Sequence, residues 1–382
     1  MIKRPETSQG EPIRAAVYLA DQNPHRDRSL GITSMTRSLL NELSTRPEVE
    51  LSLISSRSSF QGGYDQAKGM RFPFRTDHMI GRLICDTMHP LLMRPQCDLW
   101  YYPKGHLSLL MRPSTLVVGT MHDAIIQHYA DHYPETRTSS AFKYWLRVME
   151  SSLRRIDLVL TVSEHAKGQL EAFCERQRIA VPPIEVTFES SWWEIHRERR
   201  WPKNETVVHL ASAHQHKKTN HFLSLWQQLQ AQSLELPRLQ LVGRLDDEGM
   251  QTLSKLKNTE LVARLNDDAL VNAIGEARAV IISSEIEGFG LPALEAYYVG
   301  TPVCYVRGTS VEEVVTKAGD FGAFELGDAR SLYDAVRRTL DQSAATIDAI
   351  SAELYRRFSN ERYADRVISS FAKLKGNLTL PR

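Results

Sequence analysis

The sequence has few cysteines and no long apolar run. Four cysteines, Cys85, Cys97, Cys174 and Cys304, stand among 382 residues without CxxC spacing or a paired histidine cluster. This scatter argues against a disulfide framework and a zinc site, and predicts reduced thiols. No apolar run is long enough to span a bilayer, and the basic start Met1–Thr7 is not followed by the apolar stretch of a secretory signal. We therefore expect a cytoplasmic protein.

The sequence also lacks an excess of charge of either sign. The formal net charge is +1, so no global field indicates a nucleic-acid partner or an acidic substrate. Charged residues make up 24% and hydrophobic residues 42% of the chain, which is typical of a globular protein. Because 382 residues exceed one ordinary core, the length predicts about two domains.

Short β-branched runs alternate with amphipathic segments along the chain. The expected strands are residues 15–19, 49–55, 116–121, 158–162, 207–211, 239–242, 279–283, 302–306 and 321–325. The expected helices include residues 33–43, 141–154, 222–230, 331–340 and 360–374. Strand-helix alternation predicts parallel strands joined by right-handed crossovers, and therefore a doubly wound α/β fold.

The alternation stops between residues 187 and 204, where charged and aromatic residues fit neither period. We interpret this stretch as the connection between two Rossmann-like domains, residues 1–190 and 191–358, which face each other across a cleft. An amphipathic segment, 359–382, follows the second domain. Ser359 is the expected N-cap of its helix, with Arg362 at the third helical position.

One segment combines a strand, a glycine loop and a helix start. The apolar strand ends at Ser283, the loop contains Gly288 and Gly290, and a helix begins near residue 291. Glycines let backbone amides approach a ligand, and a helix N-terminus favours phosphate. Glu295 in the first turn can accept from ribose hydroxyls, and Glu287 at the loop mouth can accept from sugar hydroxyls. The alternative is that the glycines only form a turn and Glu295 only complements the helix dipole.

The string from Glu287 to Glu295 resembles the Glu-x7-Glu signature of the retaining glycosyltransferases of family 4. Residues 300–303, Gly-Thr-Pro-Val, match the Gly-x-Pro-Val that follows it in that family. Weaker similarities lie at residues 118–123, 158–167 and 312–315. The resemblance implies the GT-B fold, an acceptor-binding first domain, a donor-binding second domain, and a final helix (359–382) that crosses back to the first domain.

The resemblance also implies roles for individual residues. Glu287 and the loop residues Gly288, Phe289, Gly290 and Leu291 would hold the transferred sugar. Glu295 would hold the ribose of the donor. His122, at the end of a first-domain strand and beside Asp123, would reach the sugar and phosphate across the cleft.

Two departures from the family concern the diphosphate. The family carries Arg-x4–5-Lys near the start of the second domain, whereas residues 211–220 offer no arginine. Lys218 fits the lysine position, with Lys217 a near competitor. The residues that could replace the arginine are His214, His216, Lys217 and Arg264. The usual Gly-Gly loop after the first strand is reduced to Gly31, which still allows close backbone approach.

The expected activity is retaining transfer of a hexose-type sugar from a nucleoside-diphosphate sugar to an acceptor hydroxyl, in cell-surface polysaccharide, glycolipid or glycoconjugate biosynthesis. The resemblance implies no essential metal, and we expect no cofactor. The sequence agrees, because Asp246-Asp247 and Asp267-Asp268 are simpler as helix starts than as an Asp-x-Asp pair. Lys218, helix dipoles and loop amides would stabilise the leaving diphosphate. The alternatives are a sugar-nucleotide epimerase of the same architecture and a non-catalytic nucleotide-sugar-binding homologue.

Two first-domain segments, residues 78–94 and 142–149, combine apolar and basic groups, and Arg154 and Arg155 follow the second. Such stretches can lie in a bilayer interface, with cations on anionic lipid. The alternative is that their apolar faces pack on the sheet. The expected acceptor is a carbohydrate or is lipid-linked, and in the lipid-linked case the protein would sit peripherally at the inner membrane surface.

Overall fold

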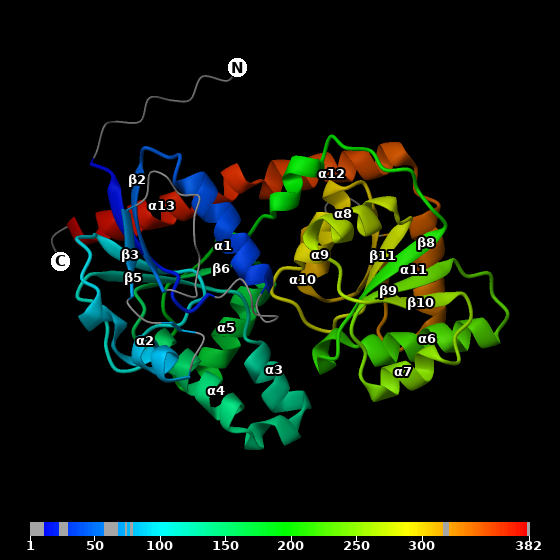
Figure 1. Ribbon diagram of the computed structural model, residues 1–382, viewed down its shortest axis with the longest axis horizontal. Helices are drawn as coiled ribbons and strands as arrows, with labels where there is room; N and C mark the ends of the chain where they lie inside the picture. The colour runs from blue at the N-terminus through cyan, green and yellow to red at the C-terminus, as the bar shows by residue number, and fades with distance from the viewer. Residues whose placement is uncertain are drawn as a thin grey trace.

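The chain forms two α/β domains that lie side by side (Figure 1). The computed structural model describes residues 11–22, 30–56, 68–72, 75–76, 79–315 and 321–379. The chain passes between the domains twice, first in the stretch that follows the last strand of the first sheet and again where α12 leads into α13.

The first domain is built on a seven-stranded sheet in the order β3-β2-β1-β4-β5-β6-β7, whose neighbouring strands all pair in parallel. Its strands are β1 (Ile13–Tyr18), β2 (Val49–Ser55), β3 (Lys68–Arg71), β4 (Leu99–Tyr102), β5 (Leu116–Met121), β6 (Leu158–Thr161) and β7 (Ile184–Val186). The strands expected at residues 49–55 and 116–121 are confirmed to the residue.

The second domain is built on a six-stranded parallel sheet in the order β10-β9-β8-β11-β12-β13. Its strands are β8 (Thr206–Ala211), β9 (Arg238–Gly243), β10 (Thr259–Val262), β11 (Ala279–Ile282), β12 (Val303–Val306) and β13 (Ala323–Phe324). The strand order reverses direction between β8 and β11, and ligands of open parallel sheets bind at the carboxyl ends of strands beside such a reversal.

Helices cover both faces of each sheet. The first-domain helices are α1 (Leu30–Leu43), α2 (Met79–Leu92), α3 (Ile125–His132), α4 (Ser140–Leu153) and α5 (Glu164–Arg176), with a 3-10 turn η1 (Pro134–Thr138). The second-domain helices are α6 (Thr219–Ala231), α7 (Asp247–Leu253), α8 (Asp267–Glu276), α9 (Leu291–Tyr298), α10 (Ser310–Val315), α11 (Ala329–Leu340) and α12 (Ala344–Phe358), with 3-10 turns η2 (Trp192–His196) and η3 (Gln215–Lys217). The predicted doubly wound architecture is confirmed.

The last helix, α13 (Asn360–Thr379), packs on the first domain beside α1 (Figure 1). Its side chains Tyr363, Val367 and Phe371 are fully buried in the core that β1, β2 and α1 also form. The Phe371 ring meets the ring of Tyr101 on β4 edge-on at 5.4 Å. One face of the first sheet is therefore closed by the end of the chain.

The junction of α12 and α13 is capped as the sequence predicted. The amide of Arg362 donates to the hydroxyl of Ser359 at 3.3 Å. The amide of Asn360 donates to the Glu194 carboxylate at 2.9 Å, which ties the start of α13 to η2 in the interdomain connection. Both contacts satisfy N-terminal amides that have no partner within the helix.

The cysteines behave as predicted, because all four are buried free thiols. Within the described residues, no helix combines the length and the hydropathy that crossing a bilayer requires.

Candidate active site

The loop between β11 and α9 lies at the carboxyl end of the second sheet. Gly290 stands at its end with φ +100°, a conformation that glycine adopts without strain, and caps α9. The hydroxyl of Ser283 donates to the Lys217 carbonyl at 2.7 Å, and the amide of Glu285 donates to the His216 carbonyl at 3.0 Å. The glycine loop is therefore held against η3, where the basic residues of this domain gather.

Glu287 is buried in this loop and forms an ion pair with Lys217. The Lys217 Nζ atom lies 2.6 Å from Glu287 Oε1. Burial alone would raise the pKa of Glu287, but the charge of Lys217 and hydrogen bonds from Lys217 and Ser284 together lower it below its ordinary value. Glu287 is therefore a carboxylate at neutral pH, with a cation fixed beside it.

Lys218, predicted to serve the diphosphate, turns to a different carboxylate. Its Nζ atom lies 3.0 Å from Glu285 Oε2. Glu285 also accepts from His128 Nε2 at 2.9 Å and from the hydroxyl of Tyr133, both of which belong to the first domain. Next to this cluster, the Tyr129 hydroxyl lies 2.9 Å from Nδ1 of His216. Lys218 thus belongs to a polar bridge between the domains, whereas Lys217 contacts Glu287.

His122 follows β5 and faces the glycine loop. Its Nδ1 lies 3.3 Å from Glu189 Oε2 and its Nε2 lies 3.0 Å from the Pro103 carbonyl. Burial alone would lower the pKa of His122, but the hydrogen bond and charge of Glu189 outweigh burial and raise it above its ordinary value. Its imidazole thus favours the charged form more than an exposed histidine does, which suits a site for a phosphorylated ligand.

The backbone of His122 touches Gly288 directly. A Cβ atom added at Gly288 would lie 2.2 Å from the His122 carbonyl oxygen. Two other contacts cross the same boundary: Ser163 donates to the Gly288 carbonyl, and the Glu313 carboxylate accepts from the amides of Glu164 and His165 at 2.9 and 3.0 Å. The second domain therefore caps the start of α5, and the glycine loop is pressed against the first domain.

Glu295 lies in the second turn of α9 and is largely enclosed. Ser191, from the interdomain connection, donates its hydroxyl to Glu295 Oε1 at 2.7 Å. Burial, reinforced by the charges of Glu189 and Asp267, raises the pKa of Glu295 to about 7. A carboxylate with one strong donor retains capacity to accept further hydrogen bonds.

Three further predicted residues, Gly31, Phe289 and Arg264, have different surroundings. Gly31, near the start of α1, faces Leu291 across the domain boundary: a Cβ at Gly31 would lie 3.8 Å from Leu291 Cδ1. Phe289 is buried, and its ring meets that of Phe358 at 5.3 Å, so only its backbone is offered to a ligand. Arg264 is exposed in the loop between β10 and α8.

Polar groups of the first domain gather at the carboxyl ends of β1 and β4, the edge to which His122 also belongs. They line a small pocket that includes Asp21, Arg82, Asp86, His106 and Trp145. Burial raises the pKa of Asp21 to about 6, and its Oδ1 atom has no hydrogen-bond partner among the described residues. An enclosed carboxyl beside an indole ring is suited to binding a sugar hydroxyl.

The sequence did not indicate Glu285, Glu189, His128 or Tyr133. Glu285 stands two residues before Glu287, and this proximity to the motif was the one available signal. Glu189 falls in the stretch interpreted as a connection, and His128 and Tyr133 lie in a helix and turn with no distinguishing pattern.

No group of three or more histidine, cysteine, aspartate or glutamate side chains in the described part of the chain is arranged to hold a metal ion. The predicted alternative role of the acidic pairs is confirmed, since Asp246 caps α7 and Asp267 is the first residue of α8.

The chain matches one protein-family model and several solved structures. Residues 192–365 match the family model described as glycosyl transferases group 1. No curated protein matches the chain. Similar solved structures include sucrose-phosphate synthase from Thermosynechococcus elongatus (15% identity, 96% of this chain and 98% of that one, TM-score 0.63) and Anabaena Alr3699/HepE in complex with UDP and glucose (15% identity, 94% and 100%, TM-score 0.63). A third is the alpha,alpha-trehalose 6-phosphate synthase of Burkholderia multivorans (10% identity, 97% and 100%, TM-score 0.66).

These likenesses establish the fold over nearly the whole chain. Residues 192–365 match the glycosyl transferases group 1 model, and the two Rossmann-like domains have the GT-B fold. The predicted fold class is confirmed.

Proposed function

We propose that this chain is a retaining glycosyltransferase that moves a hexose-type sugar from a nucleoside-diphosphate sugar to an acceptor hydroxyl, in cell-surface polysaccharide, glycolipid or glycoconjugate biosynthesis. The observation that carries the proposal is the ion pair of Lys217 in η3 with Glu287 in the loop before α9, next to Gly288, whose backbone meets that of His122. A buried carboxylate suits sugar hydroxyls, while an adjacent ammonium and a helix N-terminus suit a diphosphate. The resemblance to the family 4 enzymes supports the retaining outcome.

Each group has a separate task in this proposal. Glu287 orients the sugar, and Lys217 together with the amides of Gly288 and Gly290 stabilises the negative charge that develops on the departing diphosphate. His122, whose pKa is raised, adds positive charge from the first domain. Glu295 accepts from the ribose. Lys218 contributes at longer range from its pair with Glu285.

The chemical step exchanges one bond at the anomeric carbon for another. The bond from this carbon to the diphosphate oxygen breaks, and a bond to the acceptor oxygen forms on the same face, which retains the configuration. The acceptor proton passes to the departing phosphate oxygen, so no side chain serves as nucleophile. Contact between the domains around Gly288 excludes water and so limits hydrolysis of the donor.

A screen of nucleoside-diphosphate sugars, with and without EDTA, tests this function. Slow release of nucleoside diphosphate from one donor is expected, at a rate that an acceptor sugar increases and that EDTA does not change. Epimerised sugar nucleotide without an acceptor would favour the epimerase alternative. Binding without any turnover would favour a non-catalytic homologue. Loss of activity in EDTA, restored by magnesium or manganese, would refute charge stabilisation by lysine and amides.

Glu295→Gln is expected to weaken nucleoside-diphosphate binding at least tenfold at pH 8, because hydrogen bonds to a charged acceptor contribute about 1.5–3 kcal/mol each. The pKa of Glu295 is raised to about 7, so the carboxylate fraction, and with it the affinity of the unmodified chain, should increase from pH 6 to pH 8. Calorimetry across this range measures both effects. An affinity that keeps the same pH dependence in Glu295→Gln would remove Glu295 from the ribose site.

The outer face of α2 supports the membrane contact predicted for residues 78–94. Six apolar side chains with helical spacing are 37–71% exposed there, and Leu110, in the adjoining loop, is 75% exposed. They are Ile80, Leu83, Ile84, Met88, Leu91 and Leu92. A contiguous apolar stripe of this kind marks an interaction surface. The opposite face of α2 is anchored in the domain, since His89 Nε2 lies 2.9 Å from the Tyr102 hydroxyl.

Cations border this stripe. The Tyr144 hydroxyl donates to Asp86 at 2.8 Å, so α4 lies beside α2, and exposed Lys143 and Arg147 extend from α4. Arg94 is exposed just beyond the end of α2. Apolar side chains flanked by cations match the interface of an anionic bilayer. We therefore propose peripheral attachment through α2, with a lipid-linked acceptor.

Ile80→Gln is expected to weaken co-sedimentation with phosphatidylglycerol vesicles by about tenfold, because burying an isoleucine side chain contributes about 1.5–3 kcal/mol. Ile195→Gln is the matched control, since Ile195 in η2 has the same exposed fraction, 71%, as Ile80. Equal loss in the two variants, or no vesicle binding by the unmodified chain at low salt, would leave α2 without this role.

A further inference from the structure

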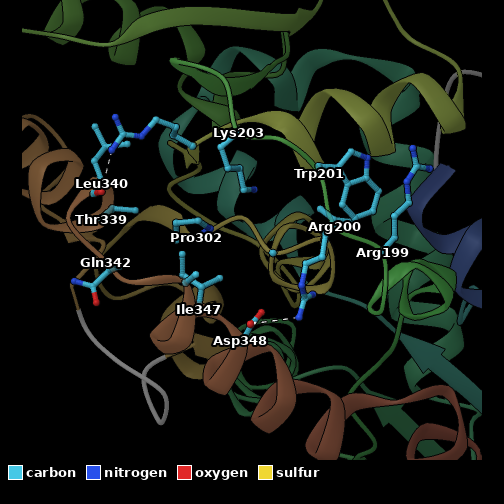
Figure 2. Close-up of a pocket in the computed structure, with 14 residues that line it drawn as sticks. Arg199, Arg200, Trp201, Lys203, Pro302, Thr339, Leu340, Gln342, Ile347 and Asp348 are labelled. Carbon is cyan, nitrogen blue, oxygen red and sulfur yellow. Dashed lines mark hydrogen bonds and ion pairs between the residues drawn. The ribbon is translucent and has the colours of Figure 1, made fainter.

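A cavity of about 300 Å³ opens in the second domain, away from the proposed donor site (Figure 2). Arg278, which immediately precedes β11, and Pro302, which immediately precedes β12, are among its lining residues. The glycine loop follows β11 instead. Because the strands are parallel, the cavity and the glycine loop lie at opposite ends of the second sheet.

Positive charge is concentrated in this cavity. Four cationic side chains and one carboxylate line it, an excess of three charges among the lining residues, whereas the whole chain carries +1. One of these cations, Arg278, also pairs with the exposed Glu205 at 3.1 Å. The cations are Arg199, Arg200, Lys203 and Arg278, and the carboxylate is Asp348. Three of the cations belong to the interdomain connection. Arg278 lies at the amino-terminal end of β11, and Asp348 belongs to α12.

The ammonium group of Lys203 donates hydrogen bonds to neutral acceptors only. Its Nζ atom donates to the Gly275 carbonyl at 2.8 Å and to the Thr301 hydroxyl at 2.7 Å, and it pairs with no carboxylate of the described residues. Burial lowers the pKa of Lys203 to about 8. An ammonium has three N–H donors, so one is left over by these two contacts. A bound anion could therefore accept the remaining N–H and form a charge-assisted hydrogen bond with Lys203.

The one carboxylate in the cavity is weakly held and can give way. Arg200 Nη2 lies 3.3 Å from Asp348, across the cavity mouth, and both side chains are at least half exposed (Figure 2). Exposed ion pairs of this type contribute about 0–1 kcal/mol. An anion can therefore recruit Arg200 at small cost. The first residue of α12, Ala344, also lines the cavity and brings a helix N-terminus to it.

Most of the remaining lining is apolar, apart from the polar side chains of Thr339 and Gln342. Val299, Pro302 and Ile347 contribute to it, and Trp201, on which Arg199 lies at 4.6 Å, forms part of the wall. A volume of about 300 Å³ corresponds to about ten waters, since a water in the liquid occupies about 30 Å³. This space is at the lower end of small-molecule sites.

We propose that this cavity binds a small phosphomonoester with an apolar or aromatic body, at a site separate from the donor and acceptor sites. Cations from the connection and from the residue before β11 line the space, and the N-terminus of α12 adds free backbone amides. This arrangement suits the tetrahedral phosphate group better than a planar carboxylate, and the apolar wall accommodates the body of the ligand.

Calorimetry on the whole chain with phenyl phosphate as the probe tests the proposal. One saturable site is expected, with inorganic phosphate about tenfold weaker because it lacks the apolar contact. Phenol, which lacks the anion, should give no saturable heat. Lys217→Ala, at the donor loop, should bind phenyl phosphate like the unmodified chain. No saturable binding, or loss of binding in Lys217→Ala, would overturn the proposal without bearing on glycosyl transfer.

Lys203→Gln preserves the donors to Gly275 and Thr301 but removes the charge, and it should weaken phenyl phosphate about tenfold. Arg200→Gln, at an exposed position, should weaken it about threefold. The matched control is Arg330→Gln, because Arg330 is 68% exposed and pairs with Asp334 at 3.2 Å, much as Arg200 is 67% exposed and pairs with Asp348. Unchanged affinity in Arg200→Gln, or an equal loss in Arg330→Gln, would overturn the site even if Lys203→Gln did not fold.

Discussion

Glu287→Gln is expected to reduce turnover by about a hundredfold or more while nucleoside-diphosphate binding changes little. A preorganised charged contact that strengthens in the transition state contributes about 3 kcal/mol, which corresponds to that factor. Glutamine keeps the size and one acceptor oxygen but removes the charge that faces Lys217 at 2.6 Å. The measurement is single-turnover kinetics with the best donor, together with calorimetry of the nucleoside diphosphate.

Glu285→Gln is the matched control for this experiment. Glu285 is partly buried and also lies beside a lysine, but its partners Lys218, His128 and Tyr133 form the bridge between the domains. Its substitution should reduce turnover only several-fold. A Glu287→Gln variant with near-native turnover, or a larger loss in Glu285→Gln, would transfer the sugar-binding role away from Glu287. His122→Ala should follow Glu287→Gln, since both act on the sugar in the proposal.

Gly288→Ala is expected to reduce turnover by about a hundredfold. The substitution changes no charge and acts by displacing the glycine loop from His122. The new Cβ would lie 2.2 Å from the carbonyl oxygen of His122, and backbone on both sides leaves no flexible end to move. The domains must separate at this point, and a misplacement of about 1 Å can change a rate by that factor. Small-angle scattering should show a larger radius of gyration for the variant.

Gly168→Ala supplies the same substitution where space exists. Gly168 lies inside α5, and a Cβ there would meet no atom within 4 Å. This variant should keep full turnover and gain up to about 1 kcal/mol in its free energy of unfolding, because alanine favours the helix. A Gly288→Ala variant that turns over like Gly168→Ala would show that the contact with His122 is dispensable.

Most of the fold could be predicted from hydrophobic periodicity, but three of the four edge strands could not. The edge strand Ile184–Val186 and the edge strand Thr259–Val262 are short and only half-buried, so neither alternation nor an apolar run marks them. Whether such a segment forms a strand depends on its pairing with a neighbouring strand. The central strand Leu99–Tyr102 is buried throughout, and its run Leu-Trp-Tyr-Tyr carried a strand signal that the alternation pattern did not use.

The site residues within the motif could be predicted from the sequence. The partners of adjacent residues could not, because the backbone conformation sends their side chains in different directions. Lys217 and Lys218 are adjacent, and spacing could not decide between them. Lys218 adopts a left-handed conformation, φ +52°, and the two ammonium groups reach carboxylates two residues apart. The contact of His128 with Glu285 joins residues 157 positions apart, which a single sequence cannot reveal.

The position of α13 has a consequence for the order in which the protein is made. The first sheet is complete in sequence at Val186, yet the face that receives Tyr363 and Phe371 stays uncovered until the last helix leaves the ribosome. At about 5–20 residues per second this interval lasts roughly 10 to 40 seconds. The second domain has all its strands and helices before that moment. The domain that is synthesised first is therefore completed after the second domain, once α13 has been made.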